Sequence, residues 1–235
     1  MSLLVLAATA RELASAIPGL AEHDLAELRP VAGRLGWRKT IFCVTGVGPL
    51  NAALAAGLCL GHDGIGEERV EAVLNVGLAG AFDLARTPLC SIWQVRREIW
   101  PEYGLNDGNS VTARAFRFPQ WEMPDGSRVY DELKLAGVEI FGFTKDEPPF
   151  AACASLTVAG VTASFDRANL LWNRYHAELE NMEGFAVALA AARSQVPCVE
   201  LRCVSNKAGP RKGDEKDFEG ALAALGQILP TLNLL

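Results

Sequence analysis

Short apolar runs that alternate with helix-like segments are the feature that most limits what this chain can fold into. Strand-like runs occupy residues 3–8, 40–48, 70–80, 89–99, 153–164 and 196–206. Runs that are apolar on both faces indicate strands buried in a parallel sheet that helices cover on both sides. The sequence therefore predicts an α/β fold. We expect a single domain over residues 1–235, with three αβα layers around a central mixed, mainly parallel sheet.

Helices are expected between these strands, at residues 9–17, 49–61, 166–177, 181–192 and 214–229. Asp166 stands where an N-cap residue of the third of these helices would lie. Residues 100–135 carry scattered prolines and glycines, so we expect that segment to be irregular.

Charge and cysteine usage exclude several classes of protein. The 235 residues have a formal net charge of −6, and the densest basic stretch, residues 206–216, is interrupted by acids and glycines. Nucleic acid and anionic membranes are therefore not expected partners. No apolar run reaches the roughly 20 residues that span a bilayer, and residues 1–10 are predicted to form a buried strand rather than a signal peptide.

The six cysteines form no C-x-x-C pair and lie mostly in apolar runs. This pattern favours reduced thiols in a cytoplasmic protein. The histidines, His23, His62 and His176, are far apart in the sequence and have no ligand-like neighbours. We therefore expect no metal and no other cofactor.

Ligands of open α/β sheets bind beyond the carboxyl ends of the strands. That rule selects residues 8–12, 46–51, 77–82 and 205–209. Thr9 and Glu12 have capping-box spacing, but Glu12 is equally suited to act as a general base at the mouth of the sheet. Gly46 and Gly48 suit a tight strand-to-helix turn. They are weak evidence for a dinucleotide site, because the third glycine of that fingerprint is missing.

Glycines and charged groups mark the other two places. Gly77 and Gly80 allow either an ordinary turn or the close approach of a flat ligand. By the period of a strand, Arg202 and Asn206 share one face, and the buried arginine needs an acidic partner, either Glu12 or Glu183. Glu183 begins an otherwise apolar helix; it could favour the helix dipole or accept hydrogen bonds from the paired hydroxyls of a sugar.

Five stretches resemble the nucleoside phosphorylase and nucleosidase superfamily: AATARE, TGVGPLNAA, LNVGLAGAF, ENMEGFAVALAA and VPCVELRCVSN. They cover most of the chain, whereas residues 100–150 match poorly. The N-M-E-G sequence followed by a strand ending in R-x-x-S-N is the most specific part. Within the superfamily, the chain is most similar to the futalosine hydrolases, the nucleosidases of the alternative menaquinone pathway.

The resemblance implies a role for each matching residue. Glu12 would activate the attacking water, Arg202 would support that water, and Asn206 would act on the purine. Glu183 would bind the ribose hydroxyls and Met182 would contact the sugar. The remaining substrate-binding residues are expected to be Leu78, Ala79, Gly80, Val161, Thr162, Phe165, Asn181 and Ser205.

Two departures bear on the substrate. Asn206 replaces an aspartate of the methylthioadenosine/S-adenosylhomocysteine nucleosidases, and its amide can donate to N7 or to the 6-oxo group of a purine. Leu78 replaces a small hydroxyl residue that is common in relatives. Few cations surround the expected site, so water is favoured over phosphate as the nucleophile. The alternatives are another purine nucleosidase, a purine nucleoside phosphorylase or a non-catalytic nucleoside-binding protein.

The expected partner is a small purine nucleoside. Relatives commonly pair, so a homodimer or a higher homo-oligomer is expected, with an apolar face within residues 85–120 as one candidate interface. Four arginines near that region are candidates for binding the benzoate end of futalosine: Arg96, Arg97, Arg114 and Arg117.

Overall fold

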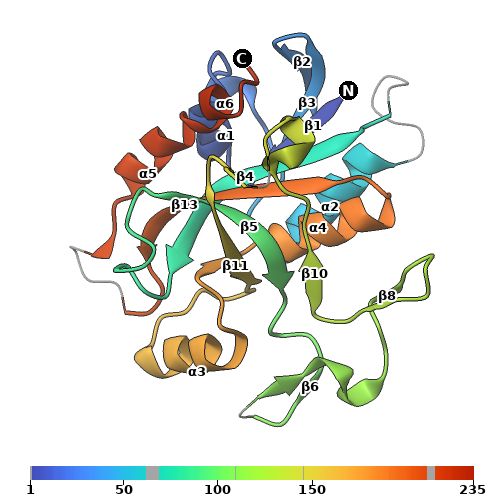
Figure 1. The fold of residues 1–235 in the computed structure, drawn as a ribbon, viewed down its shortest axis with the longest axis vertical. Helices are drawn as coiled ribbons and strands as arrows, with labels where there is room; N and C mark the ends of the chain where they lie inside the picture. The colour runs from blue at the N-terminus through green and yellow to red at the C-terminus, as the bar shows by residue number, and fades with distance from the viewer. Residues whose placement is uncertain (1, 62–68, 109, 145, 211–214) are drawn as a thin grey trace.

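A nine-stranded mixed sheet organises the chain in the computed structural model (Figure 1). The structure describes residues 2–61, 69–108, 110–144, 146–210 and 215–235; His62 and the expected helix start at Asp214 lie outside these ranges. The strands of this sheet are β1 (Leu3–Ala7), β2 (Val31–Leu35), β3 (Arg38–Val44), β4 (Ala72–Ala81), β5 (Ile92–Ile99), β10 (Glu132–Lys134), β11 (Ala151–Thr157), β12 (Leu179–Asn181) and β13 (Cys198–Lys207).

The sheet closes on itself over part of its width. Its order is β10-β5-β11-β12-β4-β1-β3-β2, and β13 pairs with both β4 and β5. Strands β4, β13, β5, β11 and β12 therefore form a closed ring, while β1, β3 and β2 extend from β4 as an open wing. The pairs β1–β3, β1–β4, β4–β13, β5–β11 and β11–β12 are parallel.

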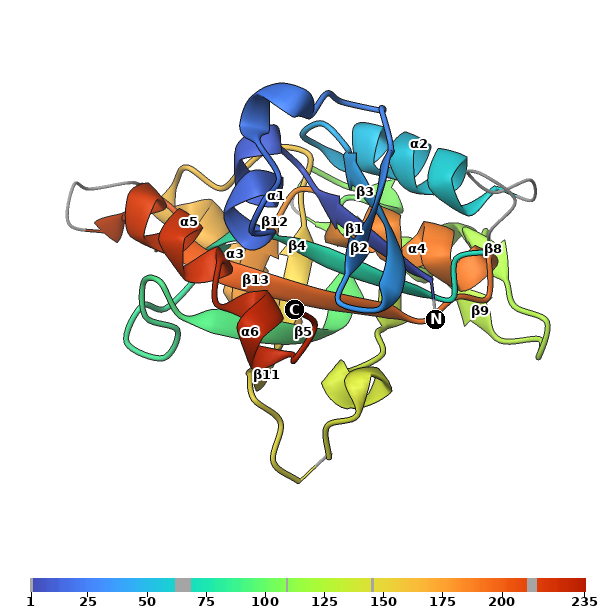
Figure 2. The same cartoon turned by 90° about the horizontal axis from the view of Figure 1, so that it is seen from above.

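Helices cover both faces of the open part of the sheet, as Figure 2 shows from above. The helices are α1 (Ala10–Ala16), α2 (Pro49–Leu60), α3 (Phe165–Tyr175), α4 (Gly184–Arg193), α5 (Phe218–Leu225) and α6 (Ile228–Thr231). Helices α1, α5 and α6 lie on one face, and α2 and α4 lie on the other. The predicted fold class, with a mixed and mainly parallel sheet between helices, is confirmed.

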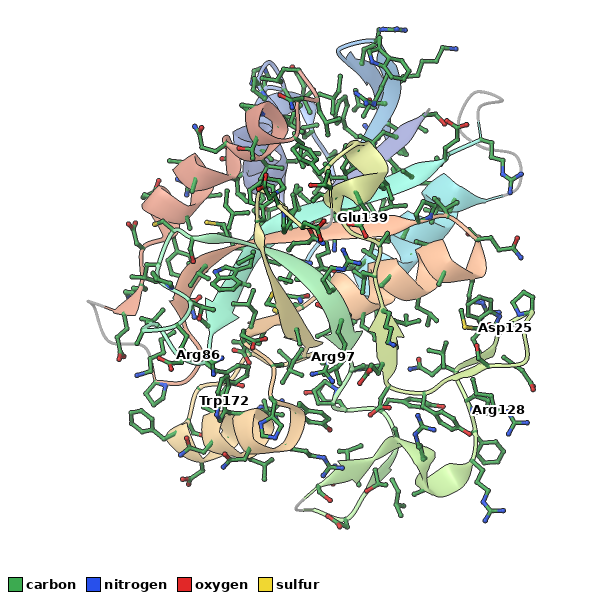
Figure 3. The ribbon with its side chains drawn as sticks, viewed as in Figure 1. Arg86, Arg97, Asp125, Arg128, Glu139 and Trp172 are labelled. Atoms are coloured by element: carbon green, nitrogen blue, oxygen red, sulfur yellow. The ribbon has the colours of Figure 1, made fainter. Side chains whose placement is uncertain are left out.

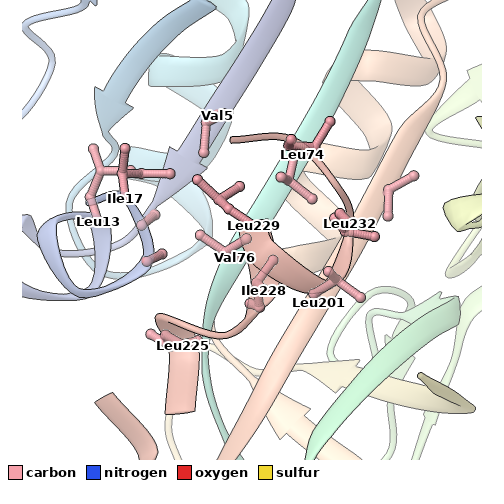
Figure 4. Close-up of a cluster of buried hydrophobic side chains, with 14 of the residues drawn as sticks. Val5, Leu13, Ile17, Leu74, Val76, Leu201, Leu225, Ile228, Leu229 and Leu232 are labelled. Atoms are coloured by element: carbon pink, nitrogen blue, oxygen red, sulfur yellow. The ribbon is translucent and has the colours of Figure 1, made fainter. Parts of the chain in front are cut away.

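The core follows from the apolar runs. Leu74, Val76 and Leu201 point from β4 and β13 toward α1, α5 and α6, where Leu225 and Ile228 meet them (Figure 4). All five side chains are fully buried. Burying an aliphatic side chain of this size stabilises a fold by about 1.5–3 kcal/mol, so these strands hold the helices firmly.

Several elements differ from the expected ones for local reasons. Strand β4 continues through Gly77 and Gly80 to Ala81, because β13 pairs with it in parallel along that whole length; these glycines are not in a turn. Strand β11 ends at Thr157 rather than at residue 164. Ser164, not Asp166, is the N-cap of α3, and its side chain accepts a hydrogen bond from the N–H of Arg167 at 3.2 Å.

Short elements fill the region expected to be irregular. Two small hairpins pair β6 (Leu105–Asn106) with β7 (Val111–Thr112) and β8 (Trp121–Glu122) with β9 (Arg128–Val129). Strand β10 then joins the edge of the main sheet. Three single-turn helices complete the described elements: η1 (Glu22–Asp24), η2 (Ala113–Phe116) and η3 (Val138–Phe141). Among the described residues, no helix has the length and apolar character that a membrane crossing requires.

Candidate active site

A cavity of about 380 Å³ opens beyond the carboxyl ends of β1, β4 and β13. This is within the range typical of small-molecule sites. All four places that the sequence selected contribute to its wall, together with β12, the start of α4, and α5. The lining residues are Ala8, Thr9, Arg11, Glu12, Val47, Leu78, Ala79, Gly80, Val161, Glu180, Asn181, Met182, Glu183, Ser205, Asn206, Phe218 and Leu222.

Glu12 makes the predicted capping box and also faces the cavity. Its Oε2 accepts hydrogen bonds from the N–H and hydroxyl of Thr9 at 3.0 and 2.7 Å, and its Oε1 accepts one from the N–H of Leu78 at 2.9 Å. The two interpretations of the sequence are therefore compatible. The cap fixes the carboxylate in place, and Oε1 retains capacity for a further hydrogen bond from the cavity side.

Glu183 is the N-cap residue of α4 and lies 5% exposed at the cavity wall. Its Oε1 accepts a hydrogen bond from the N–H of Gly48 at 3.0 Å, and its Oε2 lies 3.6 Å from Nη1 of Arg202. Gly48 has a φ of +97°, a conformation that favours glycine. Burial raises the pKa of Glu183, while Arg202 and the Gly48 N–H oppose that rise.

Arg202 lies behind the cavity rather than in its wall. Its Nε donates to Oε1 of Glu200 at 2.7 Å, and both side chains are almost completely buried. Burial lowers the pKa of the guanidinium, yet the carboxylates of Glu200 and Glu183 outweigh this effect and hold that pKa above its usual value. The predicted partner Glu183 is confirmed, but the shorter contact is to Glu200, two residues earlier on the same face of β13.

Asn181 connects this ion pair to a further buried acid. Its Oδ1 accepts from the N–H groups of Glu183 and Gly184 at 2.9 and 2.7 Å, which fixes the orientation of the amide. Its Nδ2 donates to Glu98 and Ser155, both at 2.7 Å. The amide groups are thus committed to the protein, although Asn181 borders the cavity. Burial and the nearby Glu200 raise the pKa of Glu98 well above its usual value.

Gly184 is required by the same network. A β-carbon at this position would stand 2.5 Å from Oε1 of both Glu98 and Glu200. Real β-carbons do not approach oxygen atoms so closely, so a larger residue would displace the buried acids or the start of α4.

Asn206 does not share a face with Arg202, contrary to the sequence-based expectation. Arg202 is opposite Gly77 and Asn206 is opposite Gly80, because the register between β13 and β4 shifts between Val204 and Asn206. This β-bulge inserts Ser205 as an extra residue and reverses the alternation. As a result, Asn206 faces the cavity while Arg202 points into the acid network.

Two predicted substrate residues lie outside the cavity wall. Thr162 is 1% exposed, and its N–H donates to Oε1 of Glu180 at 3.1 Å. Phe165 begins α3 and is 53% exposed. Val161 borders both the main cavity and a second, open depression of about 410 Å³ on its other side. The segment before α3 thus separates the two hollows.

The four arginines proposed for the benzoate end also lie outside the cavity wall. Arg96 pairs with Glu139 at 2.9 Å and Arg97 with Glu132 at 3.2 Å; Arg97 and Glu139 are labelled in Figure 3. Among the described residues, Arg11 is the one arginine that lines the cavity.

Sequence reasoning missed three buried acids, Glu98, Glu180 and Glu200. Each is at most 3% exposed, and each lies within a strand, where it interrupts the run of apolar residues. An acidic residue within an apolar strand was the available signal.

The chain is similar to known proteins in both sequence and structure. The profile of the Phosphorylase superfamily matches residues 128–230. The futalosine hydrolase of Streptomyces coelicolor is 31% identical over 223 residues, which cover 92% of this chain and 84% of the relative. The chain belongs to the futalosine hydrolase family. Another futalosine hydrolase, from Thermus thermophilus, is 30% identical over 203 residues, 84% of this chain and 85% of that protein.

Solved structures agree with the futalosine hydrolase fold. A mutant futalosine hydrolase of Helicobacter pylori superposes with a TM-score of 0.75 at 17% identity, covering 99% of this chain and 98% of the other. The 5′-methylthioadenosine/S-adenosylhomocysteine nucleosidase of Campylobacter jejuni gives 0.74 at 19% identity, covering 100% and 97%. At these identities the likeness establishes the fold alone.

Proposed function

We propose that the protein is an N-glycosyl hydrolase that splits futalosine into hypoxanthine and dehypoxanthine futalosine. Membership of the futalosine hydrolase family carries this proposal. The cavity supports it, because acids and an amide meet there within a space that suits a nucleoside. We place the reaction in menaquinone biosynthesis and the protein in the cytoplasm; the six free cysteines are compatible with that compartment.

The ribose would lie between Glu183 and Glu12. Glu183 accepts hydrogen bonds from the 2′ and 3′ hydroxyls, and Met182 contacts the sugar. Breaking the glycosidic bond builds positive charge on the ribose ring, and two nearby carboxylates stabilise that charge. Burial raises the pKa of Glu183, and the same low-dielectric surroundings strengthen its hydrogen bonds to hydroxyl donors.

Water is the nucleophile in this scheme. Glu12 takes its proton as water attacks C1′. A β-carbon on Gly77 would stand 3.1 Å from Oε1 of Glu12 and 2.6 Å from Nη1 of Arg202, so the acid and the guanidinium approach one point. Arg202 therefore supports the water site from behind the wall.

The leaving purine would face Asn206. The Nδ2 group donates one hydrogen to the carbonyl of Lys207 at 2.8 Å and keeps a second hydrogen for the ligand. Donation to N7 or O6 stabilises the negative charge that develops on the base. After the bond to C1′ breaks, the hypoxanthine anion takes up a proton from solvent, and Glu12 returns to solvent the proton that it took from water. Leu78, Ala79, Gly80, Val161 and Ser205 border the base and ribose.

The benzoate end would lie near Arg11 and Phe218. Both line the cavity, and both remain partly exposed, with the Arg11 side chain 53% and Phe218 41% accessible. An aromatic ring and a guanidinium suit an aromatic carboxylate. Arg11 pairs with Glu219 at 2.6 Å on the surface, a contact that a substrate carboxylate would replace.

Hypoxanthine release tests the activity. The purified protein in phosphate-free buffer is expected to convert futalosine to hypoxanthine, and chromatography measures the hypoxanthine released. Added phosphate should not raise the rate of release. A requirement for phosphate would identify a phosphorylase instead. Faster release of adenine from methylthioadenosine would identify the other nucleosidase class, and binding without turnover would identify a nucleoside-binding protein.

For the homo-oligomer we propose an interface on α2, in place of the region 85–120. Leu50, Leu54 and Leu58 follow one another at helical spacing and are 85%, 50% and 57% exposed. Val47, also 50% exposed, continues this leucine stripe to the cavity wall. Helix α2 carries no charged residue. The α2 helices of two copies of the chain can therefore meet about a twofold axis without repulsion between like charges.

A substitution in the leucine stripe tests this interface. Leu54→Glu should convert the oligomer to a monomer, because the interface would bury two unpaired carboxylates. Light scattering after size-exclusion chromatography gives the mass. The matched control is Leu170→Glu, since Leu170 is 49% exposed on α3; it should leave the mass unchanged. Identical masses for Leu54→Glu and the unaltered protein would exclude the stripe as the interface.

A further inference from the structure

Glu180 is a buried acid in the cavity wall to which the proposed reaction has given no role. It lies in β12, is 3% exposed, and lines the same cavity as Asn206. Its Oε1 accepts a hydrogen bond from the N–H of Thr162 at 3.1 Å, which fixes the carboxylate against the segment before α3. A carboxylate offers about four acceptor sites, so a ligand donor can be accepted as well.

Glu180 and Asn206 stand over the same point of β4. A β-carbon on Gly80 would lie 3.2 Å from Nδ2 of Asn206 and 3.4 Å from Cγ of Glu180. The side chains of Asn206 and Glu180 therefore pack next to each other over Gly80. Gly80 lies three residues beyond Gly77 on β4, roughly 10 Å along the strand. Glu12 and Arg202 come together at Gly77. The cavity thus has one end for the reacting sugar carbon and another end where a donor and an acceptor lie next to each other.

We propose that Glu180 selects a 6-oxopurine by accepting a hydrogen bond from its N1–H, while Asn206 donates to the neighbouring O6 or N7. The inference rests on the proposed function, because it assigns the base end of that substrate. A 6-oxopurine presents an acceptor at O6 beside a donor at N1. Glu180 and Asn206 present the complementary acceptor and donor.

An adenine reverses the partners at N1 and at position 6, whereas N7 is an acceptor in both bases. Its N1 is an acceptor and would face the carboxylate of Glu180, and its 6-amino group is a donor and would face the amide hydrogen of Asn206. A site that buries polar groups for hydrogen bonding rejects a ligand that leaves them unpaired by large factors, up to about 10⁴–10⁵. Glu180 therefore acts mainly on the choice between bases rather than on the rate of bond cleavage.

Glu180→Gln tests this assignment. If the glutamine Oε1 keeps the hydrogen bond from the Thr162 N–H, its NH₂ group points to the cavity and can donate to N1 of adenine. We expect the ratio of kcat/KM for futalosine over its 6-amino analogue to fall at least about 10-fold, since one hydrogen bond is reversed. Calorimetry with the free bases should show hypoxanthine affinity lowered and adenine affinity raised.

Glu178→Gln is the matched control. Glu178 also accepts a backbone hydrogen bond, from Ala154 at 2.9 Å, but does not line the cavity; the preference between the bases should not change. An unchanged ratio and unchanged base affinities in Glu180→Gln would overturn the assignment. If the unaltered protein hydrolysed neither nucleoside, the proposed function would fail, whereas the affinities for free bases would still decide the role of Glu180.

Discussion

Glu12→Gln is expected to lower kcat for futalosine hydrolysis by about 10²–10⁴-fold, the usual contribution of a general base. Glutamine is nearly isosteric and can still accept the hydrogen bond that the Leu78 N–H donates to Oε1, but it cannot take a proton from water. Substrate affinity should change little, because Glu183 and Asn206 are untouched. Initial rates and the Kd of the uncleaved substrate, measured on the same preparation, check both statements.

Capping of α1 must be separated from chemistry in this experiment. Thr9→Ala removes the hydroxyl that caps α1 and that contacts Oε2 of Glu12, at a cost of about 1 kcal/mol in stability. Its loss of kcat should be far smaller than that of Glu12→Gln. Equal losses of kcat in the two variants would mean that Glu12 serves the helix alone. Glu22→Gln, on an exposed turn that does not line the cavity, should behave as the unaltered protein.

The sequence could predict the positions that local rules determine. Thr9 and Glu12 are three residues apart, so the capping box was readable, and the helix start beside Glu183 followed from the small apolar residues after it. The carboxyl-end rule then brought the four strand ends together, because a parallel sheet places them at one edge.

Long-range pairings could not be read in this way. Strand β12 has three residues, and its pairing with β4 places Glu180 opposite Gly80. Glu98 reaches Asn181 across 83 positions of sequence. Neither contact has a local signal beyond an acid in an apolar strand. Such acids are visible in the sequence, but their partners are not.

The bulge at Ser205 explains the one wrong prediction of a shared face. Alternation along a strand is reliable only while the ladder is regular. The register shift after Val204 turns Asn206 to the cavity. Nothing in the sequence "RCVSNK" marks an extra residue, since the bulge depends on how β13 follows β4 in three dimensions.

Arg202→Met is expected to destabilise the fold by about 3–5 kcal/mol, because it leaves buried acids without their cation. The side chain is 1% exposed, with Glu200 at 2.7 Å and Glu183 at 3.6 Å. Methionine fills similar volume, so the loss measures charge rather than a cavity. Urea unfolding followed by circular dichroism gives the free energy of unfolding.

A second substitution identifies the cause of that loss. Adding Glu200→Gln removes the carboxylate nearest to the lost guanidinium, so Arg202→Met/Glu200→Gln should be more stable than Arg202→Met alone, by about 0.5–3 kcal/mol. Arg97→Met is the control: its pair with Glu132 is partly exposed, with side chains 36% and 43% accessible, and such pairs contribute about 0–1 kcal/mol. If the double variant were less stable than Arg202→Met, packing of the guanidinium rather than the buried negative charge would limit stability.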